Sequence, residues 1–117
     1  MEQKKFDLEE RTLKFAKSII VFCRELPNDI INSKLIDQLI RSAGSVGANY
    51  REANDALGDK DFLMRMRIAR KEAKETEFWL ELLRESNPSF QQKLEPLLGE
   101  VCELKKIISA IIIKTRK

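Results

Sequence analysis

The sequence predicts an all-α protein folded as a left-handed four-helix bundle in up-down-up-down order. Apolar residues recur at steps of three and four positions through four long segments, which is the spacing of helices that pack along one seam. The breaks between these segments are short, and short links make consecutive helices antiparallel neighbours. The chain holds only four glycines and three prolines, too few for a turn-rich β fold.

Length and composition are those of one domain spanning residues 1–117. Charged residues make up 35% of the chain and hydrophobic residues 43%, which suits amphipathic helices and not a disordered chain. Histidine is absent, so the commonest general base and the commonest metal ligand are both missing. With no paired acid motif either, the sequence predicts a non-enzymatic protein without a cofactor or a metal.

Four helices are predicted, over residues 7–26, 33–57, 59–86 and 89–115. Asp7 caps the first, with Glu10 as its capping-box partner. Its predicted seam is Leu8, Thr12, Phe15, Ile19, Phe22 and Leu26. Asn32 or Ser33 caps the second helix, and Gly58 follows its end. The second seam is Ile36, Leu39, Ala43, Val46, Tyr50, Ala53 and Leu57.

The third and fourth helices follow after links of about one and two residues. Asp59 is the expected cap of the third helix, whose seam is Phe62, Met66, Ala69, Ala73, Thr76, Leu80 and Leu83. Ser89 and Gln92 form a capping box for the fourth. Its seam is Leu94, Leu97, Val101, Leu104, Ile108 and Ile111. Pro96 either kinks this helix or marks its regular start, and we favour the kink.

Two glycines lie inside the second predicted helix. Gly44 and Gly47 each cost a helix about 1 kcal/mol relative to alanine, so another chain segment is expected to come close to them. A phosphate-binding loop is disfavoured, because no strand precedes the glycines and no partner residue stands at the required spacing.

Gly44 shares an outward face with Arg41, Ala48, Arg51 and Asp55. We interpret this face as a contact with another copy of the chain. The alternative is that the small residues occur there by chance, on an exposed surface that tolerates them. Surplus apolar residues on the last two helices favour the interface, because one core cannot absorb them all. The predicted oligomer interface is Arg41, Gly44, Ala48, Arg51, Phe78, Trp79 and Leu82. A membrane surface as partner is disfavoured, since no clear basic amphipathic pattern is present.

A polar stripe flanks the second seam and contains Ser42, Ser45, Asn49 and Glu52. We assign Ser45, Asn49 and Glu52 to structural polar contacts, and expect Asn49 and Glu52 to hydrogen-bond to a neighbouring helix. A catalytic role for Glu52 would need a second positioned group, for which Glu72 or Glu75 would be candidates.

Basic residues gather on the third helix at Arg65, Arg67, Arg70, Lys71 and Lys74. Not all five can face the same way, and the predicted nucleic-acid site is the tighter group of Arg67, Arg70, Lys71 and Lys74. The alternative is a solvated face, which is weakened by like charges at i, i+4 spacing. The net charge of +3 permits RNA or DNA as a partner without demanding it.

Cys23 and Cys102 are interpreted as small buried hydrophobes in preference to a disulfide or a nucleophile. A reducing cytoplasm is therefore the expected compartment. The N-terminus has no apolar signal core, and the longest apolar run, residues 107–113, is too short to span a bilayer.

The stretch Gln38-Leu-Ile-Arg-Ser-Ala-Gly-Ser-Val-Gly-Ala-Asn-Tyr-Arg-Glu-Ala53 resembles bacterial four-helix-bundle proteins encoded in intervening sequences of 23S ribosomal RNA genes. The resemblance continues in Asp61-Phe62, Ile68-Ala69 and the segment 71–80. It implies a bundle that assembles into a ring, typically a pentamer. It also implies a relation to accessory proteins of diversity-generating retroelements, which bind a reverse transcriptase and nucleic acid. Tyr50 departs from the small or β-branched residue that many relatives carry.

The function expected from these observations is a homo-oligomeric scaffold or adaptor that binds nucleic acid or a nucleoprotein through its basic surface. The alternative is a purely structural oligomer, or a protein-binding module without nucleic-acid affinity.

Overall fold

The structure is a computed structural model that describes the backbone of residues 2–116 and the side chains of residues 8–116. Its elements are α1 (Glu2–Glu25), α2 (Ile30–Asn54), α3 (Asp59–Ser86), the 3-10 turn η1 (Pro88–Phe90) and α4 (Gln91–Arg116). The described residues contain no strand. The predicted all-α four-helix fold is therefore confirmed.

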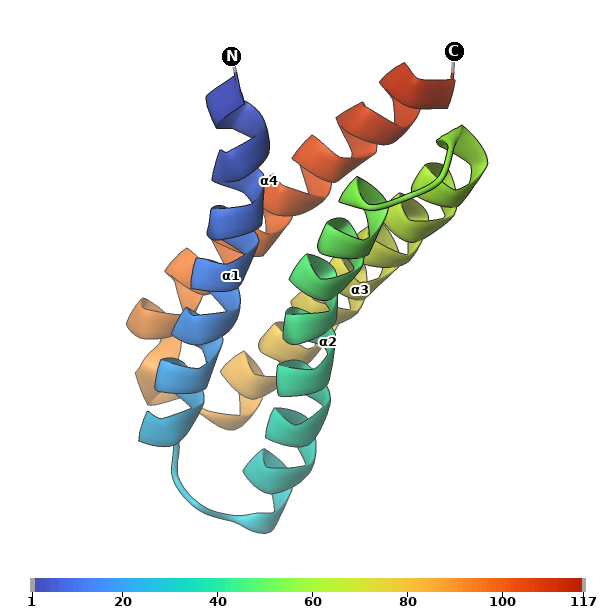
Figure 1. Cartoon of the computed structure of the whole chain (residues 1–117). Coiled ribbons are helices and arrows are strands. Elements are labelled where there is room, and N and C mark those ends of the chain that lie inside the picture. Colours follow the sequence, from blue (N-terminus) through green and yellow to red (C-terminus); the bar gives the residue numbers. More distant parts are fainter. Residues whose placement is uncertain (1, 117) are drawn as a thin grey trace.

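The four helices run alternately up and down the molecule (Figure 1), so the predicted order is confirmed as well. The α1–α2 link lies at one end of the bundle and the α2–α3 link at the other, where the start of α1 and the end of α4 also lie, apart from each other. Each helix packs on the next in sequence, and α4 returns to pack on α1. The α2–α3 pair makes the most extensive contact, and the bundle measures 45 × 25 × 19 Å.

The core contains most of the predicted seam. All six predicted seam residues of α1 are buried, as are all of those on α3 except the half-buried Phe62. On α4 the predicted Ile111 is only half-buried, and the neighbouring Ile112 enters the core instead. Leu57 is 97% exposed, so its place on the seam was wrong. The periodicity therefore identifies the buried face better than it identifies the helix ends.

The second helix begins and ends three residues earlier than predicted. Asp29 is its N-cap, with a side chain that accepts a hydrogen bond of 2.8 Å from the Asn32 backbone N–H. The helix ends at Asn54, and the four residues 55–58 form the link. Leu57 lies in this link, which is why it leaves the seam. Gly58 has a φ of +150°, a conformation that favours glycine, and it precedes α3 instead of closing α2.

The other predicted caps are also wrong. Because α1 begins at Glu2, Asp7 lies inside the helix, and its side chain lies outside the described residues. Asp59 is the first residue of α3, whose N-cap is Gly58 without a side-chain hydrogen bond. Ser89 lies within η1 and forms no cap. The fourth helix starts at Gln91 and continues through Pro96, so Pro96 does not mark its start.

Two buried asparagines join the links at one end of the bundle. Asn32 and Asn87 exchange amide hydrogen bonds of 2.9 and 2.8 Å. The Asn32 amide also donates to the Pro27 carbonyl at 2.9 Å, and the Asn87 amide donates to the Leu83 carbonyl at 3.0 Å. This pair satisfies buried polar groups where a helix start meets a helix end, and so fixes α2 against the end of α3.

The two interior glycines of α2 have different surroundings. A Cβ at Gly47 would lie 2.9 Å from Thr12 Oγ1 and 3.1 Å from Thr12 Cβ, so α1 and α2 approach closely there. A Cβ at Gly44 would meet no atom within 4 Å. The close approach expected from the sequence is therefore found at Gly47, where α1 of the same chain packs on α2. At Gly44 no segment of the same chain comes close.

Among the described helices, none is long and apolar enough to cross a membrane. The described residues also contain no group of three or more His, Cys, Asp or Glu residues that could hold a metal ion.

Candidate nucleic-acid interface on α3

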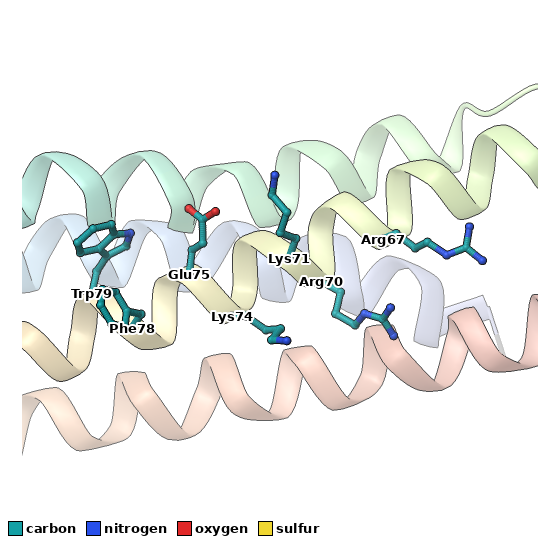
Figure 2. Close-up of a pocket in the computed structure, with 7 residues that line it drawn as sticks. All are labelled: Arg67, Arg70, Lys71, Lys74, Glu75, Phe78 and Trp79. Carbon is teal, nitrogen blue, oxygen red and sulfur yellow. The ribbon is translucent and has the colours of Figure 1, made fainter.

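The candidate site is a shallow hollow of about 440 Å³ along the outer face of α3, here called the α3 groove. Because the seam of α3 faces the core, residues at the complementary helical positions point outward. Figure 2 shows Lys71 and Glu75 on the α2 side of this face, with Arg70 and Lys74 on the α4 side. The groove is lined by Arg67, Arg70, Lys71, Lys74, Glu75, Phe78 and Trp79.

Two acidic residues of α3 are paired with a cation from α2. Arg41 forms ion pairs of 3.2 Å with Glu72 and 2.6 Å with Glu75. The hydrogen bond with Glu75, together with the charge of Glu72, raises the pKa of the Arg41 guanidinium above its ordinary value. Glu72 is buried, so this pairing provides the counter-charge that a buried carboxylate needs.

The third acid, Glu77, is paired with a cation from α4. Lys105 Nζ lies 2.9 Å from Glu77 Oε1, and the Cys102 thiol donates to Glu77 Oε2 at 2.7 Å. Burial, and then the hydrogen bond to Glu77, raise the pKa of Cys102, so the thiol keeps the proton that it donates. Glu77 therefore has its counter-charge from α4, and it does not line the α3 groove.

The four predicted nucleic-acid residues, in contrast, have no ion pair or hydrogen bond with any described residue. Arg67, Lys71 and Lys74 are exposed, and Arg70 is half-buried. Arg67 with Lys71, and Arg70 with Lys74, form two pairs of like charge at i, i+4 spacing. Each pair destabilises the helix by a few tenths of a kcal/mol. Arg65 points elsewhere, since its guanidinium donates to Asn49 Oδ1 at 3.5 Å. The structure thus brings together the tighter group and separates Arg65 from it.

Two aromatic residues from the predicted oligomer interface complete the α3 groove. Phe78 is 54% exposed, and its ring centroid lies 5.1 Å from that of Trp79 in an edge-to-face arrangement at 74°. The Trp79 indole N–H is buried and has no acceptor among the described residues. From the sequence alone, the basic residues and the aromatic residues are assigned to two different sites. The steps of three and four from position 67 to 71, 74 and 78 indicate a single face, and could have revealed it.

The remaining predicted interface residues are exposed on α2. Arg41, Gly44, Ala48 and Arg51 all face outward, although Arg41 is engaged by the acids of α3. Leu82 is 37% exposed on α3, where it lines a second hollow next to Phe78.

Further exposed apolar residues, outside the predicted interface, lie on α1 and α2. Leu13, Ile20 and Ile40 are each 41 or 42% exposed. Since α1 and α2 are antiparallel and meet at Thr12 and Gly47, helical spacing places all three on the outer side of this helix pair, together with Gly44. We call Leu13, Ile20, Ile40, Gly44 and Ala48 the α1–α2 face.

The predicted polar stripe is only partly engaged. The Asn49 amide donates to the Ser45 carbonyl and hydroxyl at 2.9 Å each, and Ser42 is buried 2.9 Å from the Thr76 hydroxyl. Glu52 is exposed and has no hydrogen bond with a described residue, against the expectation of a contact with a neighbouring helix.

Both cysteines are free thiols. Cys23 is buried among apolar residues, and this burial raises its pKa to about 11. Cys102 is half-buried and hydrogen-bonded. A thiol whose pKa lies this far above neutral pH is a poor nucleophile, which agrees with a structural role for Cys23.

Comparisons with known proteins agree with this structure. Residues 4–110 match the model of the family described as 23S rRNA-intervening sequence protein. The chain is similar to a crystal structure from Bacteroides thetaiotaomicron, a protein of unknown function from the S23 ribosomal protein family, with 33% identity and a TM-score of 0.80. The alignment covers 90% of this chain and 97% of that one. A comparison with curated protein sequences gives no match. The family match spans most of the bundle, and the chain belongs to the 23S rRNA-intervening sequence protein family.

Proposed function

We propose that this chain is a non-enzymatic, homo-oligomeric scaffold that binds nucleic acid, alone or within a nucleoprotein, through Arg67, Arg70, Lys71 and Lys74. The observation that carries the proposal is the distribution of charge on α3. Glu72, Glu75 and Glu77 are each paired with a cation from a neighbouring helix, while the four basic residues have no partner among the described residues.

This arrangement raises the positive potential of the α3 groove above what the net charge suggests. A net charge of +3 is modest for a nucleic-acid-binding protein. Local potential depends on where the charges lie, and the acids closest in sequence to the cations are already neutralised from α2 and α4. Phosphates that bind here would release condensed counterions, which makes binding salt-dependent and weak in sequence preference.

Assembly would multiply this effect. The α1–α2 face presents exposed apolar side chains around Gly44, where an added side chain meets nothing in the same chain. An open helical glycine set among exposed apolar side chains supports close approach by another helix, most simply from a second copy. A ring, for which the resemblance implies a pentamer, repeats the α3 groove once per copy, and linked sites bind more tightly than one.

One observation favours the alternative of a structural oligomer or protein-binding module. Phe78 and Leu82 expose apolar surface on the same helix, and such surface is typical of protein contacts. A reverse transcriptase as the protein partner rests on the resemblance alone and stays a prediction. We place the scaffold in the cytoplasm, where free thiols such as Cys23 stay reduced.

The proposal is tested by the double variant Arg67→Glu, Lys71→Glu, titrated with structured RNA and with duplex DNA at low and physiological salt. The unmodified protein should bind with an affinity that falls steeply as salt rises. In a plot of log K against log salt concentration, the slope should be about −0.7 to −0.9 for each phosphate contact. The variant should lose most of this affinity and keep its assembly, since both side chains are exposed and unpaired.

The matched control is Lys14→Glu, Lys114→Glu, on α1 and α4, which makes the same change in net charge at two exposed lysines outside both the α3 groove and the α1–α2 face. The control should retain most of the affinity. If the two double variants lose equal affinity, net charge and not the α3 groove governs binding. If the unmodified, assembled protein binds neither nucleic acid at low salt, the proposed function is wrong and the structural alternative replaces it.

A further inference from the structure

We propose that the α3 groove recognises single-stranded nucleic acid, with an unpaired base stacked on Phe78 and the adjoining phosphates held by Arg70 and Lys74. This inference rests on the proposed function and adds to it the kind of nucleic acid that is bound.

Arg70, Lys74 and Phe78 follow one another at intervals of four residues along α3. Side chains at this spacing lie one turn apart on the same side of a helix. Figure 2 shows the two cations on the α4 side of the groove, with the aromatic pair beyond them at its end. A strand that runs along α3 would therefore meet two positive charges in succession and then an aromatic ring.

Phe78 is held in place while more than half of its surface stays open. The edge-to-face contact with Trp79, at 5.1 Å between centroids, constrains the Phe78 ring. The ring nevertheless remains 54% exposed beside the cations. Proteins that bind single strands combine a positively charged groove with aromatic side chains on which bases stack, because every base has a π-face.

A duplex would gain less from this arrangement. Its bases are stacked on one another and cannot reach Phe78, so only its phosphates would meet the groove, through Arg67, Arg70, Lys71 and Lys74. An unpaired nucleotide adds the stacking contact to the phosphate contacts. The α3 groove should therefore prefer a single strand over a duplex of the same length.

A second copy of the chain is the competing occupant of Phe78. Beyond Phe78 the exposed acids Glu81 and Glu85 begin a second hollow, and these could pair with cations of another copy. Phe78 lines both hollows. We favour the nucleic acid because the four cations in the α3 groove have no partner among the described residues, and phosphates would supply the negative charge that they lack.

Trp79 gives a direct readout, because it is the single tryptophan of the chain and contacts Phe78. Oligothymidine of about 12 nucleotides, a length within the range that one single-strand site covers, should quench its fluorescence at low salt. Phe78→Ala should weaken oligothymidine binding by about tenfold, the size of one lost stacking contact. It should leave the affinity for a duplex of the same length unchanged, and Phe78→Tyr should restore the affinity for the single strand.

The control is Met64→Ala, which removes another exposed apolar side chain of α3 from outside the groove and should change neither affinity. If Phe78→Ala leaves the affinity for oligothymidine unchanged, or lowers both affinities equally, the stacking inference is wrong. It is also wrong if Phe78→Ala lowers the mass of the assembly by light scattering, since Phe78 then serves a protein contact. None of these outcomes contradicts the proposed function if the double variant Arg67→Glu, Lys71→Glu still loses most of its affinity for nucleic acid.

Discussion

Gly44 and Gly47 lie one turn apart on α2, and the structure explains only one of them within the chain. At Gly47 the Thr12 side chain occupies the space that a Cβ would need, so glycine allows α1 to pack closely on α2. At Gly44 this space is open. The helical cost of each glycine could be predicted from the sequence, because it depends only on residue type. Which glycine faces a neighbour depends on where two helices cross, and no local pattern encodes that.

Gly47→Ala should destabilise the bundle, although alanine is the better helix former. The added Cβ would lie 2.9 Å from Thr12 Oγ1, so α1 or the Thr12 side chain must move. Gly99→Ala on α4 is the matched control, since a Cβ there meets nothing within 4 Å. That change should raise the free energy of unfolding by about 0.5 to 1 kcal/mol. Urea unfolding measures both, and two stabilising changes would contradict the close approach at Gly47.

At the scale of the elements, the buried seams were predicted well and the helix ends poorly. The seam of α1 follows from spacing alone, because six apolar or small residues at steps of three and four can only share one face. Helix ends depend on a competition between neighbouring cap candidates. Asp29 and Asn32 can both cap a helix, and Asp29 does so because Asn32 is committed to a buried bond with Asn87, distant in sequence.

Asn87→Ala should destabilise the bundle by about 1 to 3 kcal/mol, because one N–H of the buried Asn32 amide loses its acceptor. Asn32 would keep its bonds to the Pro27 carbonyl and from the Ser86 hydroxyl, so the fold should persist. Asn28→Ala is the control, since Asn28 is an exposed link residue. Thermal unfolding followed by circular dichroism compares the two variants. A melting temperature equally unaffected by both would show that the Asn32–Asn87 pair contributes nothing to stability.

At the scale of the whole molecule, the two candidate surfaces lie on different helices. The sequence separated Arg65 from a tighter basic group, because helical spacing fixes which positions are neighbours on the helix surface, and in the structure that group lines the α3 groove while Arg65 contacts Asn49. It assigned Phe78 and Trp79 to the oligomer interface, whereas the structure places them in the α3 groove. The pairing of Arg41 with Glu72 and Glu75 depends on the register between α2 and α3, which is a tertiary property. That pairing gives Glu72 and Glu75 a counter-charge from α2, although Glu75 lines the α3 groove beside the cations.

We propose that the bundle works as an assembly of identical copies, and the mass of the protein in solution tests this proposal most directly. Light scattering at micromolar concentration should give a multiple of the 13.6 kDa chain. Gly44→Leu should lower that mass without loss of helix, because the new side chain fits the single chain but blocks a close neighbour. Gly99→Leu, at an equally open site on α4, should leave the mass unchanged. A mass of 13.6 kDa for the unmodified protein would contradict the claim.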